Sequence, residues 1–117
     1  MNQTLKALII KFLMTFVVAW ISLGFIENNT LTWILIFSLI GAIVNYIIGD
    51  LFILPTFGNL VASLGDGIMG ALVAYLLSTM TENLNVTLNS LVLLGALIAI
   101  GEYFFHKYLI KNDKVSP

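Results

Sequence analysis

Four apolar runs dominate the sequence, and each is long enough to cross a lipid bilayer as a helix. About 20 residues, rising 1.5 Å each, cover the roughly 30 Å of hydrocarbon in a membrane. The runs cover residues 5–26, 31–53, 60–80 and 88–109. Closed β-barrels are the other way to span a bilayer, but these runs are too long for barrel strands and lack their alternation. We therefore predict an all-α, integral membrane four-helix bundle, a single transmembrane domain over residues 1–117.

Short polar segments connect the predicted helices, at residues 27–30, 54–59 and 81–87. Pro55 lacks a backbone N–H and does not fit a helix interior, so the second helix is predicted to end near Ile53 or Leu54. Asn59 is of a type that favours helix N-caps, and we expect it to cap the third helix. The first run has no small-residue cleavage site at its end, which favours a retained helix over a signal peptide.

The composition excludes most soluble functions. Apolar residues make up 60% of the chain and charged residues 9%, whereas soluble chains have about 45–50% and about 25%. Soluble enzymes and disordered tails are therefore excluded. The chain has no arginine and a net charge of −1, so no nucleic-acid partner is expected. Because it has no cysteine, disulfides and cysteine-ligated zinc are excluded too.

The placement of the lysines predicts the orientation, because positive charge collects in short cytoplasmic segments. All five lysines lie near the two termini: Lys6, Lys11, Lys107, Lys111 and Lys114. The first and third connections carry only the acidic residues Glu27 and Glu82. We therefore predict that both termini are cytoplasmic, in a multi-pass protein of the bacterial inner membrane. Four spans also return the chain to the side on which it starts.

Three ionisable residues lie at similar depths in the predicted spans, where a charge costs roughly 2.5–3.5 kcal/mol at mid-helix. Lys11 and Asp66 lie six residues inside the starts of the first and third runs, and Glu102 lies seven before the end of the fourth. At 1.5 Å per residue, all three are about 9–10 Å from the cytoplasmic boundary. We predict that they form one coupled layer.

Helical phase adds further polar residues to this layer. Positions three or four apart share a helix face, so Asp66 aligns with Asn59 and Gly70, and Glu102 aligns with His106. Asp50 and His106 are expected closer to the interface. The candidate intramembrane polar cluster comprises Lys11, Asp50, Asn59, Asp66, Glu102 and His106. Three interpretations stay open: an ion-pair network that fixes the order of the helices, a proton or small-cation site open to the cytoplasm, or a snorkelling lysine with unrelated carboxylates.

Neither a catalytic site nor a metal site is expected. Glu102 and His106, four residues apart, could both ligate a metal, but a site needs three or four ligands and the chain has one histidine. No nucleophile, base and orienting residue come together, so we predict no enzyme activity and no cofactor. The sequence Gly65-x-Gly67-x-x-Gly70 fits a dinucleotide motif, but it lies in an apolar span and follows no strand, so helix packing explains it better.

The second and fourth helices resemble each other at an offset of 54 residues, where 40–44 matches 94–98. A duplication would give two parallel helical hairpins, whereas a shared apolar composition would produce the same match without one. Gly41, Gly95 and Ala99 are left over once the Asp66 face is packed, and such small-residue stripes predict self-association, at least into a dimer.

Two stretches carry a family resemblance. One is Ile10-Lys11-Phe12, and the other is Ile48-Gly49-Asp50-Leu51-Phe52-Ile53-Leu54-Pro55 with its continuation through Phe57-Gly58-Asn59-Leu60-Val61-Ala62 to Asp66. The chain resembles, over all four helices, the YndM-like family of small four-helix membrane proteins of unknown function from spore-forming Gram-positive bacteria. The Gly-Asp-Leu-x-Ile-Leu-Pro stretch is the specific part. The resemblance implies a cytoplasmic-membrane protein without an assigned activity.

We therefore expect a homo-oligomeric protein embedded in the lipid bilayer that serves as a structural or stress-related membrane component. The alternative is a small proton- or cation-coupled transporter or channel that uses Asp66 and Glu102. A carrier of the small multidrug-resistance type has a similar length, but its signature is a glutamate in the first helix, where this chain has Lys11. A second alternative is a holin-like pore, which would lyse cells on overexpression without any substrate.

Overall fold

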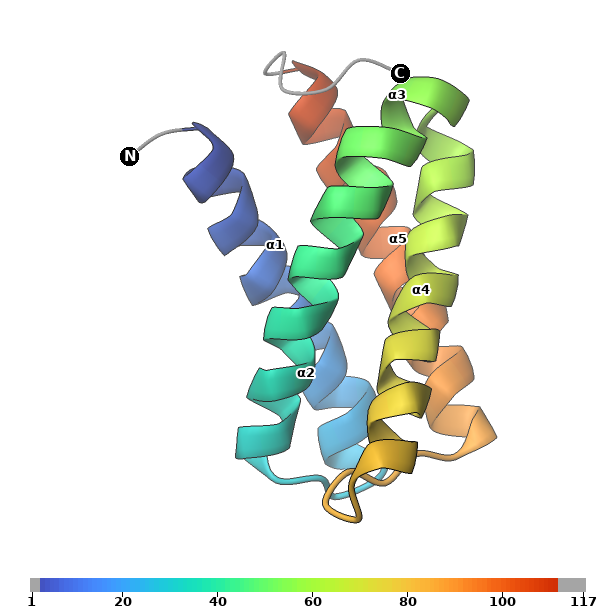
Figure 1. Ribbon diagram of the computed structural model, residues 1–117. Coiled ribbons are helices and arrows are strands. Elements are labelled where there is room, and N and C mark those ends of the chain that lie inside the picture. The colour runs from blue at the N-terminus through green and yellow to red at the C-terminus, as the bar shows by residue number, and fades with distance from the viewer. Residues whose placement is uncertain (1–2, 112–117) are drawn as a thin grey trace.

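Seven helical segments make up the described part of the chain (Figure 1). The computed structural model describes residues 3–111, and of residues 3 and 108–111 it describes the backbone alone. Two of the lysines used above for the orientation, Lys111 and Lys114, therefore lie outside the described side chains. In chain order the segments are α1 (Gln3–Ala19), η1 (Trp20–Phe25), α2 (Leu31–Val44), η2 (Asn45–Ile53), α3 (Leu54–Phe57), α4 (Asn59–Met80) and α5 (Leu88–Lys111), of which η1 and η2 are π-helical.

These segments form four helices that are long and apolar enough to cross a membrane: Thr4–Phe25, Leu31–Phe57, Asn59–Met80 and Leu88–Lys107. The prediction of an all-α fold with four spans is confirmed, and residues 3–111 contain no strand. A helix satisfies its own backbone hydrogen bonds, which is why apolar runs of this length take this form in lipid.

The four helices pack as a ring, with α1 against α2, η2 against α4, α4 against α5, and α5 against α1. Helix α1 begins and α5 ends at the same end of the bundle (Figure 1). Small and polar side chains face the bundle interior, as predicted for α4. Its Ala62, Asp66 and Gly70 are buried, whereas Leu64 and Ile68 are 54% and 64% exposed on the outer face.

The second span is longer than predicted, because its helix continues through Pro55 to Phe57 instead of ending at Ile53 or Leu54. The π-helical turns of η2, which precede Pro55, change the spacing of the backbone hydrogen bonds. The Leu54 N–H therefore donates to a carbonyl five residues back. Pro55 therefore falls in the first turn of α3, where its missing N–H is tolerated.

The prediction that Asn59 caps the next helix is also wrong. Gly58 occupies the N-cap position of α4, with φ +88°, and no side chain caps this helix end. The Asn59 side chain is held elsewhere, because its Nδ2 donates a hydrogen bond to the Tyr103 carbonyl on α5 at 3.0 Å. The bond to α5 thus takes the place of the predicted cap.

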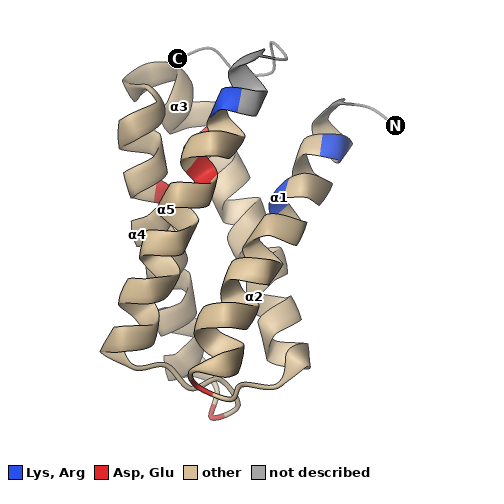
Figure 2. Cartoon of the chain, turned by 180° about the vertical axis from the view of Figure 1, so that it is seen from behind, with Lys and Arg blue, Asp and Glu red and all other residues tan. Residues whose placement is uncertain are grey.

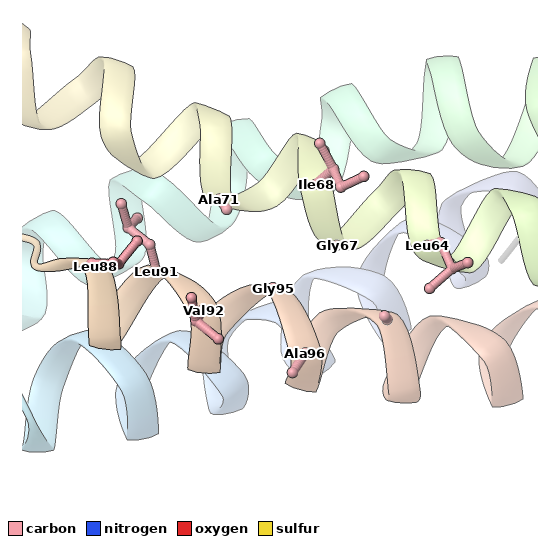
Figure 3. Close-up of a pocket in the computed structure, with 10 residues that line it drawn as sticks. Leu64, Gly67, Ile68, Ala71, Leu88, Leu91, Val92, Gly95 and Ala96 are labelled. Carbon is pink, nitrogen blue, oxygen red and sulfur yellow. The ribbon is translucent and has the colours of Figure 1, made fainter.

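Helices α4 and α5 approach closely at a pair of glycines. A Cβ on Gly67 would collide with the carbonyl oxygen of Gly95, and an apolar groove of about 520 Å³ lies beside this contact (Figure 3). Gly41 is also used inside the chain, against Phe37 and Thr15. The glycines expected to drive self-association therefore pack within one chain. Self-association stays a prediction to which no surface is assigned.

At the opposite end of the bundle, Asn29 joins the first and third connections. Its Nδ2 donates to the Leu23 carbonyl at 3.0 Å and to the Asn85 carbonyl at 2.7 Å. The Asn85 N–H donates back to Asn29 Oδ1 at 2.7 Å. The Thr87 hydroxyl donates to the Glu27 carboxylate between the same two connections. These bonds tie the two helical hairpins together at this end.

Candidate functional site

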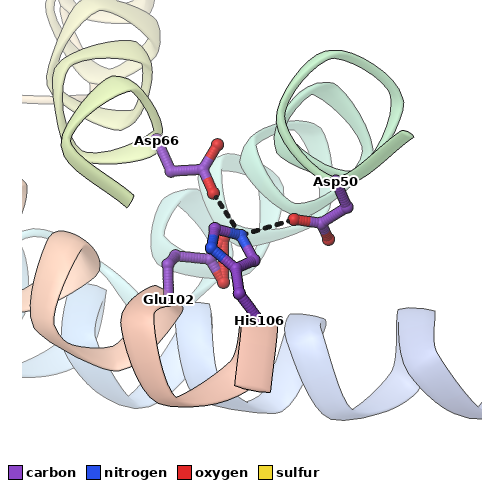
Figure 4. Close-up of side chains that lie close together, drawn as sticks. All are labelled: Asp50, Asp66, Glu102 and His106. Atoms are coloured by element: carbon purple, nitrogen blue, oxygen red, sulfur yellow. Dashed lines mark hydrogen bonds and ion pairs between the residues drawn. The ribbon is translucent and has the colours of Figure 1, made fainter. Parts of the chain in front are cut away.

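A layer of ionisable side chains crosses the inside of the bundle, and every helix of the ring contributes to it. Figure 4 shows the four members that come from η2, α4 and α5. Lys11 comes from α1, Asp50 from η2, Asp66 from α4, and Glu102 and His106 from α5. All five are 0% exposed. Figure 2 shows the buried acidic segments nearer to the end where α1 begins, with further acidic residues in the connections at the opposite end. We call these five residues the charged layer.

Lys11 is the central cation of the charged layer. Its Nζ donates a hydrogen bond to Asp50 Oδ2 at 2.8 Å and another to Glu102 Oε2. Asp66 Oδ2 lies 3.9 Å from the same nitrogen, and the ring of Phe105 lies 5.1 Å away. One ammonium group therefore connects α1 to carboxylates on the three other helices.

His106 is the second link between the acidic residues. Its Nε2 lies 2.7 Å from Asp50 Oδ1 and 3.0 Å from Asp66 Oδ2. Asp50 thus uses one oxygen for Lys11 and the other for His106. Neither carboxylate oxygen of Asp66 has a hydrogen-bond partner within the described residues, although Oδ2 lies within ion-pair distance of both Lys11 and His106.

The other ring nitrogen of His106 faces an acceptor whose orientation is fixed. Its Nδ1 lies 2.8 Å from Asn59 Oδ1 and 3.2 Å from the Ser63 hydroxyl. Since Asn59 Nδ2 donates to Tyr103, its Oδ1 must be the atom that faces the imidazole. An amide oxygen only accepts hydrogen bonds, so the proton lies on Nδ1. Nε2 therefore turns toward two carboxylates and needs a proton or another cation between it and them.

Negative charge exceeds fixed positive charge in the charged layer. Its three carboxylates face one lysine and one histidine. With His106 neutral, ionised carboxylates and Lys11 leave a net charge of −2, and with His106 protonated they leave −1. Glu102 Oε1 and Asp66 Oδ1 are buried, and neither has a hydrogen-bond partner in the part of the chain that the structure describes. Uncompensated charge is costly in a low-dielectric interior, so the layer favours binding a further cation.

Apolar side chains close the charged layer on both sides. One cluster contains Ala7, Leu54, Ala62 and Phe105, each within four residues of a member of the layer and on the side where α1 begins. A second cluster, with Phe37, Leu94 and Ile98 among its members, fills the other side. Apolar side chains thus lie on both sides of the charged layer, and on the side where α4 begins the partly exposed Asn59 and the buried Ser63 add polar contacts to His106.

The structure brings together all six residues of the predicted cluster, but Asp50 and His106 lie deeper than predicted. Both are 0% exposed and share the charged layer with Lys11, Asp66 and Glu102, the residues that were predicted to lie further from the interface. For Asp50 the reason is the extended second helix, because it lies seven residues before Phe57, a depth similar to those of Lys11 and Asp66. For His106 it is the extension of α5 to Lys111.

Sequence reasoning missed two buried polar residues, one that contacts the charged layer and one on η2 before Asp50. Ser63 donates to Asn59 Oδ1 at 3.0 Å and contacts His106; its position three residues before Asp66 was an available signal. Asn45 is 1% exposed, with an amide that has no partner within the described residues. In an α-helix it would not face the same way as Asp50, five residues later. The π-helical turn aligns them, and no sequence signal indicated that turn.

Gly49 permits the approach of Asp66 to the second helix. A Cβ at this position would collide with the Asp66 carboxylate. In the Gly49-Asp50 pair, the glycine therefore leaves space for the Asp66 carboxylate, and the aspartate contributes a carboxylate to the charged layer.

This glycine–aspartate pair belongs to the stretch that carried the family resemblance, and comparison with known families confirms it. The family model described as "Protein of unknown function (DUF2512)" matches residues 2–115. The chain belongs to the DUF2512 family. In this DUF2512 chain, four helices that are long and apolar enough to cross a membrane meet in a buried charged layer.

The chain is also similar to a curated protein, the "Uncharacterized membrane protein YndM" of Bacillus subtilis (strain 168). The two are 30% identical over 107 residues, which cover 91% of this DUF2512 chain and 60% of YndM. The chain thus spans somewhat less than two thirds of that relative's length. No solved structure matches it.

Proposed function

We propose that the chain is a non-enzymatic protein of the bacterial inner membrane whose charged layer binds an exchangeable cation, in the simplest case a proton, and passes it across the bilayer. The observation that supports this is the excess of buried carboxylates over fixed cations, together with carboxylate oxygens that have no partner. Ionisable residues inside membrane spans commonly mark ion or proton pathways. Among the alternatives drawn from the sequence, this proposal corresponds to the small proton- or cation-coupled transporter or channel. Asp66 and Glu102 are its central groups, and Asp50 and His106 join them.

Proton flux in proteoliposomes tests this proposal. Vesicles that contain the purified chain and a trapped pH indicator are given a proton gradient with a potassium–valinomycin clamp. We expect the wild type to dissipate the gradient faster than protein-free vesicles, and Asp66→Asn to lower that rate at least tenfold. Glu82→Gln is the matched control, because it removes an exposed carboxylate from a connection and is expected to leave the rate unchanged.

Equal rates for the wild type, Asp66→Asn and protein-free vesicles would contradict the proposal. That result would favour the second candidate, a structural membrane component in which the charged layer only fixes the arrangement of the helices. One observation supports this candidate: Lys11 alone contacts carboxylates on three other helices. A buried ion pair that fixes register is the best-attested structural use of such groups.

A further inference from the structure

His106 is oriented as metal-binding histidines are. In such sites one ring nitrogen binds the metal, while the other donates its hydrogen to an oxygen that fixes the tautomer. Here Nδ1 faces the Asn59 amide oxygen at 2.8 Å, and Tyr103 fixes that amide in turn. Nε2 is left facing Asp50 and Asp66. When Nε2 gives up its proton, its lone pair therefore points at a place where two carboxylates converge.

The surrounding oxygens complete a ligand set. One ligand atom from each of Asp50, Asp66, Glu102 and His106 lies within 4.8 Å of the others, and all four residues are buried. Ligands of a tetrahedral divalent site with bonds near 2.0–2.2 Å stand about 3.3 Å apart. The Nε2 distances of 2.7 Å to Asp50 and 3.0 Å to Asp66 have to grow by about 0.6 Å and about 0.3 Å, and separations of up to 4.8 Å within the set have to shrink.

Lys11 bonds to only one oxygen of Asp50 and one of Glu102, and its positive charge determines the net charge of the charged layer. Its Nζ uses Asp50 Oδ2 and Glu102 Oε2, whereas Asp50 Oδ1 faces His106 and Glu102 Oε1 has no partner. With Lys11 charged and His106 neutral, the charged layer carries −2. One divalent cation makes it neutral, whereas a single proton does not.

We propose that His106 Nε2 and the carboxylates of Asp50, Asp66 and Glu102 bind one divalent transition-metal ion, of the class of Zn²⁺, Mn²⁺ or Fe²⁺. This inference rests on the proposed function and names the cation for the same layer. An imidazole with carboxylates suits these ions better than Mg²⁺, which prefers oxygen ligands and retains its waters. From the sequence no metal site was predicted, because only Glu102 and His106 were recognised as possible ligands. The fold brings two more possible ligands, Asp50 and Asp66, from other helices.

Titration of the full chain in mild detergent tests the metal site. Metal-free protein is titrated with Zn²⁺ and with Mn²⁺ by calorimetry. We expect one ion per chain, with Mg²⁺ binding at least 100-fold more weakly. X-ray absorption on the zinc-loaded wild type is expected to show one nitrogen among oxygen ligands, and it needs no variant to fold.

Variants assign the ligands. His106→Gln and Asp66→Asn are each expected to weaken Zn²⁺ binding at least 100-fold. Asn59→Ala keeps every ligand and removes only the partner of Nδ1, so a loss of about tenfold is expected. Glu82→Gln and Glu27→Gln are the matched controls and are expected to bind as the wild type does. Circular dichroism establishes that each variant is folded.

Three results would overturn the inference: no saturable binding, a spectrum without a nitrogen ligand, or binding that survives both His106→Gln and Asp66→Asn. The proposed function is judged separately by the proton flux. If Asp66→Asn abolishes the flux and the wild type binds no metal, the proposed proton transfer is retained and the metal site is refuted. Metal binding without flux would support the metal and refute proton transfer.

Discussion

Lys11 shows how a single residue determines the energetics of the interior. It is a fully buried cation that contacts two carboxylates directly and a third at 3.9 Å. Removal of one partner from a buried ion pair costs about 3–5 kcal/mol, because the other charge is left uncompensated. We expect the three carboxylates to contribute unequally to this cost, because Asp50 and Glu102 bond to Lys11 directly and Asp66 does not.

Double-mutant cycles measure this inequality. Lys11→Leu alone is expected to destabilise the protein by about 3–5 kcal/mol. Addition of Asp50→Asn or Glu102→Gln should restore much of the loss, and addition of Asp66→Asn should restore less. Thermal unfolding in detergent gives the coupling energies, which reach about 0.5–3 kcal/mol for groups in contact. Strictly additive losses for all three pairs would show that the charged layer is not energetically coupled.

At the scale of the helices, the sequence predicted the number and type of the spans, because about twenty consecutive apolar residues leave few other folds. It also predicted that Lys11, Asp66 and Glu102 share a depth, which residue counting alone provides. It did not predict the place of Asp50. That position depends on the π-helical turns before Pro55, for which the residues of this one helix carry no recognisable pattern.

The close approach of α4 to α5 at Gly67 can be tested by a substitution that has a matched control on the same helix. Gly67→Ala places a methyl group against the Gly95 carbonyl, so the helices must separate, and overpacking of this kind costs about 1–3 kcal/mol. Gly65→Ala is the same change on the same helix, but its nearest neighbour is Ile53 Cδ1 at 3.7 Å, an ordinary contact. It is expected to be neutral or to stabilise by up to about 1 kcal/mol. Equal melting temperatures for the two variants would contradict the close approach.

For the whole molecule, the placement of charge predicts the orientation in the membrane. The described lysines lie in the first and last helices, and the first and third connections carry Glu27 and Glu82. Because α1 begins and α5 ends at the same end of the bundle (Figure 1), one orientation satisfies both lysine-bearing segments.

Reporter fusions test this orientation. A reporter that is active only in the cytoplasm should be active when fused after residue 111, and one that is active only outside should be active when inserted within residues 28–30. The reverse pattern, or an external carboxyl end, would contradict cytoplasmic termini. Glu27→Lys with Glu82→Lys weakens the asymmetry and is expected to produce mixed orientations.

The bonds of Asn29 between the first and third connections fasten the two hairpins to each other at that end of the bundle. At the other end, Gly58 alone separates α3 from α4, so the chain itself joins the hairpins there. The charged layer lies toward this second end, where α1 begins and α5 ends (Figure 2). The two hairpins are thus linked on both sides of the charged layer, by side-chain hydrogen bonds on one side and by the backbone on the other.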